Sequence, residues 1–291
     1  MLKQWEGAAK VMSQAVELRQ VLFAAEPETH CTNLSQSLHD LGIYRSNLMQ
    51  WEGAAEVTNQ ALELRQVLHA ADPETHRSSL SDSFYSLGYL RSMLKQWEGA
   101  VEVTSQAVEL RQVLFAAEPE THRSGLSDSL HNLGVYRSIL MQWEGAARVM
   151  SQAVELRKAL FAAEPETHRL GLSDSLNSLG LYHSMLKHWE DAAEVTSQAV
   201  ELRQVLFAAE PETHRSNLSD SLHSLGFYRS NLRQWEGAVE ATSQAVELRQ
   251  VLFAAEPETH RSNQSQSLHN LGLYRSMLKQ WEGAADAMSH H

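Results

Sequence analysis

The sequence predicts an all-α fold in which antiparallel helix pairs stack into a solenoid. Tryptophan recurs every 46 residues without insertions, at Trp5, Trp51, Trp97, Trp143, Trp189, Trp235 and Trp281. Proline occurs once in each period and nowhere else, at Pro27, Pro73, Pro119, Pro165, Pro211 and Pro257. Between these markers the apolar residues follow helical spacing. A period of this length is typical of repeat proteins in which each repeat is one supersecondary unit.

The first helix of each period begins at the proline. Proline suits the first turn of a helix because its missing N–H would have no partner there. In the fifth copy the apolar residues after Pro211 are separated by steps of four, three, three and four: Leu218, Leu222, Leu225, Tyr228 and Leu232. This spacing predicts a helix with one buried face. In the first copy this helix, helix A, is expected over about Pro27 to Leu48.

The second helix of each period begins near the tryptophan, after a short break at Arg233 and Gln234 in the fifth copy. Its apolar positions in that copy are Ala238, Ala241, Ala245, Leu248 and Leu252, flanked by Val246 and Phe253. The apolar arc covers roughly half of the helix circumference, which favours packing against two neighbours. In the second copy this helix, helix B, is expected over about Trp51 to Ala71, and no strand pattern competes with either helix.

Residues 1–291 are expected to form one repeat array of six periods and a partial seventh. A helix pair cannot bury its apolar face alone, so neighbouring pairs must share a continuous core. The chain begins with a helix B that lacks its helix A, and it ends 11 residues into another helix B. Either the chain is a segment of a longer array, or its open ends associate and give filaments.

Composition excludes several classes of partner. The chain has 291 residues and a net charge of −12, without clusters of lysine and arginine, which argues against nucleic acid and anionic membrane surfaces. Cys31 is the only cysteine, so no internal disulfide can form and a reducing, cytoplasmic compartment is expected. No stretch of about 18 apolar residues predicts a membrane span.

The repeat resembles the tetratricopeptide repeat. The residues that carry the resemblance in the third copy are Leu130, Leu133, Gly134, Tyr136, Leu140, Trp143, Ala146, Ala153 and Pro165. The usual period of that family is about 34 residues, and the longer helix B here is similar to the long-helix repeats of kinesin light chains. The resemblance implies a right-handed superhelix whose concave groove, lined by helix A, binds a protein or an extended peptide. The aromatic residue of helix A sits one position early, at Tyr136, compared with the family pattern.

The copies differ from one another mainly on one face of helix A. Six columns carry three or more residue types, and all lie within about a third of the helical wheel, opposite the core stripe that includes Leu38 and Leu41. The column after the Leu-Gly pair varies most: Ile43, Tyr89, Val135, Leu181, Phe227 and Leu273. The remaining candidate partner-binding residues are His39, Asp40, Asn47, Asp82, Tyr85, Ser86, Met93, Asp128, His131, Asn132, Ile139, Asp174, Asn177, Ser178, Met185, Asp220, His223, Ser224, Asn231, His269 and Asn270.

Drift at exposed positions does not by itself explain this variation. The outer positions of helix B should be equally exposed, yet they hardly change between copies; in the second copy they are Glu52, Gln60, Glu63 and Gln66. The contrast favours a recognition surface over drift combined with packing inside the groove. The aspartates at the centre of the varied arc, such as Asp82, predict a negative groove that favours basic partners.

No catalytic site, cofactor or metal site is expected. The recurring histidines, such as His30, lie about 180° around the helix from His39, so the two cannot share one ion. The segment from Asp128 to His131 contains the letters of a catalytic triad, but Ser129 points about 100° away and no oxyanion donors are apparent. The sequence therefore predicts a non-catalytic interaction scaffold. The alternative is a structural protein that assembles end to end, and a monomer that persists at every concentration would exclude it.

Overall fold

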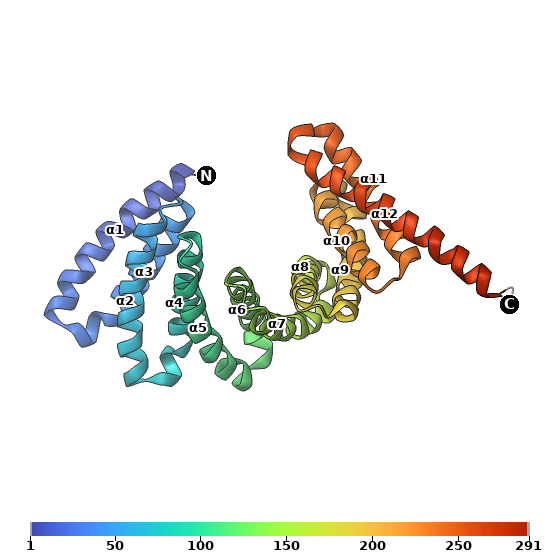
Figure 1. The fold of residues 1–291 in the computed structure, drawn as a ribbon. Coiled ribbons are helices and arrows are strands. Elements are labelled where there is room, and N and C mark those ends of the chain that lie inside the picture. Colours follow the sequence, from blue (N-terminus) through green and yellow to red (C-terminus); the bar gives the residue numbers. More distant parts are fainter. Residues whose placement is uncertain (1, 290–291) are drawn as a thin grey trace. The chain divides into compact units, whose positions relative to one another are not determined.

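The computed structural model describes residues 2–289, and within that range the fold consists of helices joined by short turns (Figure 1). The helices are α1 (Leu2–Ala25), α2 (Pro27–Asn47), α3 (Trp51–Ala71), α4 (Pro73–Met93), α5 (Trp97–Ala117), α6 (Pro119–Ile139), α7 (Trp143–Ala163), α8 (Pro165–Met185), α9 (Trp189–Ala209), α10 (Pro211–Asn231), α11 (Trp235–Ala255) and α12 (Pro257–Ser289). The all-α prediction is confirmed. The expected helices of the first two copies agree with α2 and α3 to within one residue.

The chain divides into two compact units, Met1–Val149 and Met150–His291, and the boundary falls within α7. Within the first unit consecutive helices from α1 to α6 pack against one another, and within the second unit those from α8 to α12 do so. None of the helices described carries an apolar stretch long enough to cross a bilayer.

Two kinds of turn connect the helices. A single residue separates each B helix from the next A helix, and in the second copy the side chain of Asp72 accepts a hydrogen bond from the backbone N–H of Thr75. The A-to-B turn contains a residue in the left-handed region, with φ between 57° and 61°, at Met49, Lys95, Met141, Lys187 and Arg233. Left-handed geometry costs a residue with a side chain about 1 kcal/mol, so packing of the following helix must offset it.

The last copy departs from the expected pattern. A break before Trp281 was predicted by analogy with the other copies, but α12 continues through this point and runs from Pro257 to Ser289. Lys279, the counterpart of Arg233, does not adopt the left-handed conformation, and the backbone continues as one helix.

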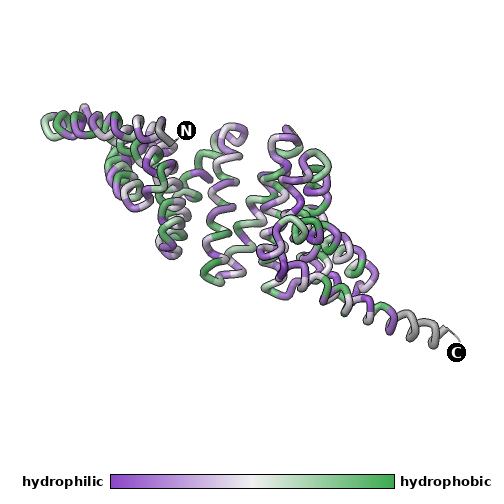
Figure 2. The backbone as a smooth tube through the Cα atoms, turned by 90° about the horizontal axis from the view of Figure 1, so that it is seen from above, coloured by the Kyte–Doolittle hydropathy of each residue, from purple (hydrophilic) through white to green (hydrophobic). Residues whose placement is uncertain are grey.

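The core of each unit lies between the helices. In the second unit Leu218, Leu222 and Leu225 of α10 pack against Ala241 of α11 and Val200 of α9. Figure 2 shows hydrophobic and hydrophilic residues alternating along the helices, as expected when one face is buried. The small residues of the tetratricopeptide-like pattern, such as Ala146 and Ala153, are completely buried.

Candidate interaction surface

A set of apolar side chains on the A helices is exposed to solvent. It consists of the most varied column, and five of its members are 41 to 51 % exposed: Ile43, Tyr89, Leu181, Phe227 and Leu273. Val135 is half-buried. These six residues are called the exposed ladder below. Apolar side chains of this size are normally covered, so their repetition in each unit marks the A-helix face as a candidate contact surface.

One helical turn further along each A helix, a second column lies on the same face. Met93, Ile139 and Met185 are exposed there, as are Asn47 and Asn231. Each asparagine side chain donates a hydrogen bond to the carbonyl of the ladder residue four positions earlier, at 2.8 to 2.9 Å. Ladder and second column therefore form one continuous strip along the helix.

In the first unit the strip borders a hollow of about 280 Å³ between α2, α3 and α4. Ile43 and Asn47 of α2 line one side, and Tyr85 and Tyr89 of α4 line the other. The ring of Tyr89 meets the ring of Trp51 edge to face, with centroids 6.3 Å apart. Trp51 thus packs against one side of Tyr89, and the rest of the Tyr89 side chain is exposed to solvent.

In the second unit Phe227 of α10 is held in the same way. Its ring meets that of Trp189 edge to face, with a centroid distance of 5.8 Å. The neighbouring Tyr228, which occupies the early aromatic position noted in the sequence, is buried and also contacts Trp189. The early aromatic residue therefore belongs to the core, and the ladder residue beside it does not.

The candidate residues four positions before the ladder lie between consecutive A helices. Ser221 Oγ donates to Asn177 Oδ1 at 2.8 Å, and His223 Nδ1 lies 2.9 Å from Ser267 Oγ. In the first unit Asn132 Nδ2 donates to the hydroxyl of Tyr85 at 3.2 Å, and His39 is buried. Asn132, Asn177 and His223 were predicted to line an open groove, and each of them makes a hydrogen bond between neighbouring A helices.

The predicted negative groove is wrong at the aspartates whose contacts are described. Asp82 accepts from Arg111 Nη2 at 2.8 Å, and Asp174 and Asp220 accept in the same way from Arg203 and Arg249 at 2.8 and 2.7 Å. The first copy has Gln36 at this position, and it accepts from Arg65 at 2.9 Å. Because an arginine pairs with each of the three aspartates, their carboxylates do not select for a basic partner.

The arginine of helix B is a structural residue that sequence reasoning missed. Nη1 of Arg203 donates to the backbone carbonyl of Asn217 and to Ser221 Oγ on the next A helix, while Nη2 reaches Asp174 on the preceding one. The side chain is 7 % exposed. Arg65, Arg111 and Arg249 make the same contacts. The available signal was an arginine that never changes inside an otherwise apolar stripe. This arrangement is called the arginine clamp below.

Ser129, which the triad-like segment contains, belongs to the same clamp. Its Oγ accepts a hydrogen bond from Arg111 Nη1 at 2.7 Å. The hydroxyl is therefore oriented by a guanidinium, which cannot take up its proton as a general base would.

The stability of the second unit is expected to fall as the pH falls from about 6.5 to 4. Burial and the charge of Arg249 lower the pKa of His223 from the ordinary 6.5 to about 4. In this window the unfolded chain binds the proton and the folded chain does not, so acid favours unfolding, by about 2 kcal/mol once partial exposure is allowed for.

The variant His223→Asn tests this assignment, because asparagine occupies the same position in the fourth copy, at Asn177. Urea unfolding at several pH values should show a smaller acid loss in this variant, and equal losses would contradict the assignment.

Comparison with solved structures places the arrangement among tetratricopeptide-type folds. BtubC (BKLC) from P. vanneervenii aligns with a TM-score of 0.59 and 19 % identity over 85 % of this chain and 92 % of its own. YrrB, described as a TPR protein with an unusual peptide-binding site, aligns with a TM-score of 0.54 and 16 % identity over 80 % and 93 %. A putative kinesin light chain of Podosopora anserina with nearly identical TPR-like repeats aligns with a TM-score of 0.53 and 20 % identity over 78 % and 98 %.

No protein-family model and no curated protein matches the sequence. At the identities of the structural matches, the likeness shows the fold alone. The chain has the fold of tetratricopeptide-repeat proteins, with stacked antiparallel helix pairs as the resemblance implied.

Proposed function

We propose that this protein is a non-catalytic interaction scaffold that binds a protein or an extended peptide along its A helices. The exposed ladder is the observation that carries the proposal. Its residues differ in nearly every copy, while the buried residues on either side of it, such as Gly226 and Tyr228, hardly change. A surface that is apolar, exposed and individually varied suits recognition of a particular partner sequence.

The chemistry of the strip indicates what kind of segment would fit. Packed helices are spaced by roughly 10 Å, so ladder residues on successive A helices are expected at about this separation. An extended peptide advances about 3.3 Å per residue. A peptide lying along the ladder residues of one unit would therefore place an apolar side chain at about every third position. Asn47 and Asn231 are exposed beside the ladder, and their side-chain oxygens are acceptors suited to the N–H groups of a peptide backbone.

Tyr89→Ala is expected to weaken partner binding with little effect on folding. Peptides selected from a random display library against the whole chain supply a defined ligand, whose affinity calorimetry then measures. Loss of a central aromatic contact should weaken binding about tenfold or more. The free energy of unfolding should fall by only about 1 kcal/mol, because the ring is already 41 % exposed.

Val67→Ala provides the matched control. Val67 is 66 % exposed on the B helix α3 and lies outside the ladder. Its removal should leave peptide affinity unchanged. Peptides that bind the Tyr89 variant as tightly as the native chain, or that lose affinity equally with both variants, would contradict the proposal.

End-to-end assembly is the second candidate function, and exposed apolar side chains on α1 and α12 favour it. Val11 of α1 is 66 % exposed, whereas its counterpart Val57 is 6 % exposed. Leu268 of α12 is 50 % exposed, whereas its counterpart Leu222 is 3 % exposed. In α2 and α3 these positions pack an A helix onto a B helix, so α12 of one copy could pair with α1 of another. Sedimentation should then show mass rising with concentration, and Leu268→Lys should abolish the rise.

A further inference from the structure

The fourth copy differs from all others at three positions around one turn. His183 near the end of α8 stands where every other copy that includes the position has arginine. His188, the residue before α9, stands where the others have glutamine, and Asp191 in the first turn of α9 stands where they have glycine. Three unique residues, all of them able to ligate a metal, thus occur within nine positions of a chain that otherwise repeats closely.

The changes at positions 183 and 191 depend on each other, because the two side chains compete for the same space. In the second copy Arg91 Nη1 donates to the carbonyl of Gly99 at 3.1 Å, so the arginine lies directly over the glycine. A Cβ added at Gly237 in the fifth copy would come within 3.0 Å of the side chain of Arg229. An aspartate at this position therefore fits where the arginine has been replaced by the shorter histidine.

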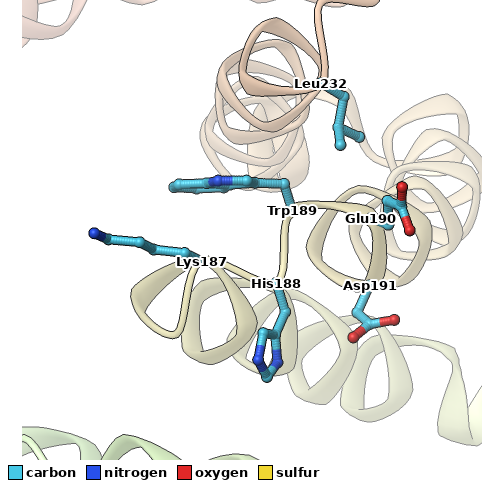
Figure 3. Close-up of a pocket in the computed structure, with 6 residues that line it drawn as sticks. All are labelled: Lys187, His188, Trp189, Glu190, Asp191 and Leu232. Carbon is cyan, nitrogen blue, oxygen red and sulfur yellow. The ribbon is translucent and has the colours of Figure 1, made fainter.

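The three side chains come together in the folded protein. Each offers a ligand atom, and these atoms lie within 4.8 Å of one another. His183 Nδ1 is 4.0 Å from Asp191 Oδ2, and it is a buried nitrogen without a hydrogen-bond partner among the described residues. Figure 3 shows His188 and Asp191 on the same side of the chain, away from Trp189 and Leu232. The two histidine rings are 6.0 Å apart between centroids.

We propose that His183, His188 and Asp191 form a binding site for a divalent transition-metal ion such as Zn²⁺. Two imidazoles and one carboxylate are a zinc-type donor set, and water would complete the coordination. Zinc holds such ligands at about 2.0 to 2.2 Å, which requires their ligand atoms to lie roughly 3.4 Å apart. Because His188 and Asp191 are exposed, rotation of their side chains can close the remaining distance. Nitrogen ligands disfavour Ca²⁺ and Mg²⁺.

The surroundings suit a cation. Glu190 and Asp191 place two carboxylates in the first turn of α9, which offsets the positive end of the helix dipole. The side chain of Lys187 extends away from both His188 and Asp191 (Figure 3). Burial lowers the pKa of His183, which favours the neutral ring that has a lone pair to donate. A bound ion would join α8 to α9 in this copy as the arginine contact does in others.

The test is a calorimetric titration of the whole chain with Zn²⁺. The triple variant H183R/H188Q/D191G restores the residues of the other copies, so it should fold as they do, and circular dichroism checks this. The native chain should bind one Zn²⁺ ion per chain more than the variant, and Zn²⁺ should raise only the native melting temperature. His183→Ala alone should weaken this site by about 100-fold or more, since even outer-shell changes cost 10- to 100-fold.

A transplant provides the converse measurement. R229H/Q234H/G237D moves the three residues to the same turn of the fifth copy and should add one further Zn²⁺ ion per chain. Equal Zn²⁺ binding by the native chain and by H183R/H188Q/D191G would overturn the proposal and leave these residues as a His–Asp ion pair at the start of α9. The other histidines of the chain contribute equally to both proteins, so they cancel in the comparison.

Discussion

Gly226→Ala is expected to destabilise the second unit by about 2 to 3 kcal/mol, although it adds a single methyl group. A Cβ at Gly226 would lie 2.1 Å from Thr242 Oγ1 and 3.2 Å from the carbonyl oxygen of Ala238. Thr242 is fully buried in α11 and cannot rotate away without disturbing its neighbours. Forcing α10 and α11 apart costs more than the added methyl contributes to helix propensity. Urea unfolding followed by circular dichroism measures the difference.

Two variants make this prediction specific. Thr242→Ala removes the nearest atom, so the double variant with Gly226→Ala should recover most of the lost stability. Gly272 occupies the same column of α12, and nothing lies within 4 Å of a Cβ placed there. Gly272→Ala should therefore stabilise the chain by up to about 1 kcal/mol. The same sign of effect at both glycines would refute the close approach of the A and B helices.

Arg203→Ala is expected to cost about 3 kcal/mol, because it removes the arginine clamp between two repeats. The substitution leaves the buried hydroxyl of Ser221 and the carbonyl of Asn217 without the donor they have in the native chain, and Asp174 without its counter-charge. A buried acceptor that loses its donor stays desolvated, so the loss at Ser221 dominates, whereas Asp174 is 42 % exposed and contributes less. Urea midpoints of the variant and the native chain give the value.

Controls separate the clamp from general charge effects. Arg261 forms an ion pair with Glu258 in the first turn of α12, but its side chain is 64 % exposed, so Arg261→Ala should change stability little. Asp174→Gln keeps an acceptor for the clamp, as Gln36 does for Arg65, and should cost far less than Arg203→Ala. Equal losses from Arg203→Ala and Arg261→Ala would contradict the clamp.

The helices are predictable from the sequence because their signals are local and repeat in register. Pro211 fixes the start of α10, and the steps from Leu218 to Leu232 identify its buried face without reference to any partner. The continuation of α12 through Lys279 is not predictable in this way. A turn that costs free energy forms only if the next helix packs back, and that packing is a tertiary property.

The exposure of the ladder is predictable because helical geometry places it opposite the core stripe. What the sequence does not reveal is which polar neighbours remain available. His223 and Asn177 differ from the ladder by one helical turn, yet they join consecutive A helices. Only the spacing between repeats decides this, and the spacing depends on side chains such as Arg203 that belong to another helix.

The cluster of His183, His188 and Asp191 is not found when the copies of the repeat are searched for positions that always carry histidine. Its signal is the opposite one, three departures within a single copy. Their meaning depends on a turn that brings residues 183, 188 and 191 together, since the positions lie on two different helices.

Cysteine footprinting in the presence of a selected peptide tests the proposed function most directly. In a Cys31→Ser background, single cysteines replace Tyr89 of the ladder and Val67 of the outer face, and a water-soluble maleimide reports the accessibility of each. Both cysteines should react readily in the free protein, because both positions are exposed. Peptide at a concentration that saturates each cysteine variant, raised for position 89 to offset the weaker binding expected without the Tyr89 ring, should slow the reaction at position 89 and leave position 67 unaffected. Protection at position 67, or a rate at position 89 that saturating peptide does not change, would contradict recognition by the exposed ladder.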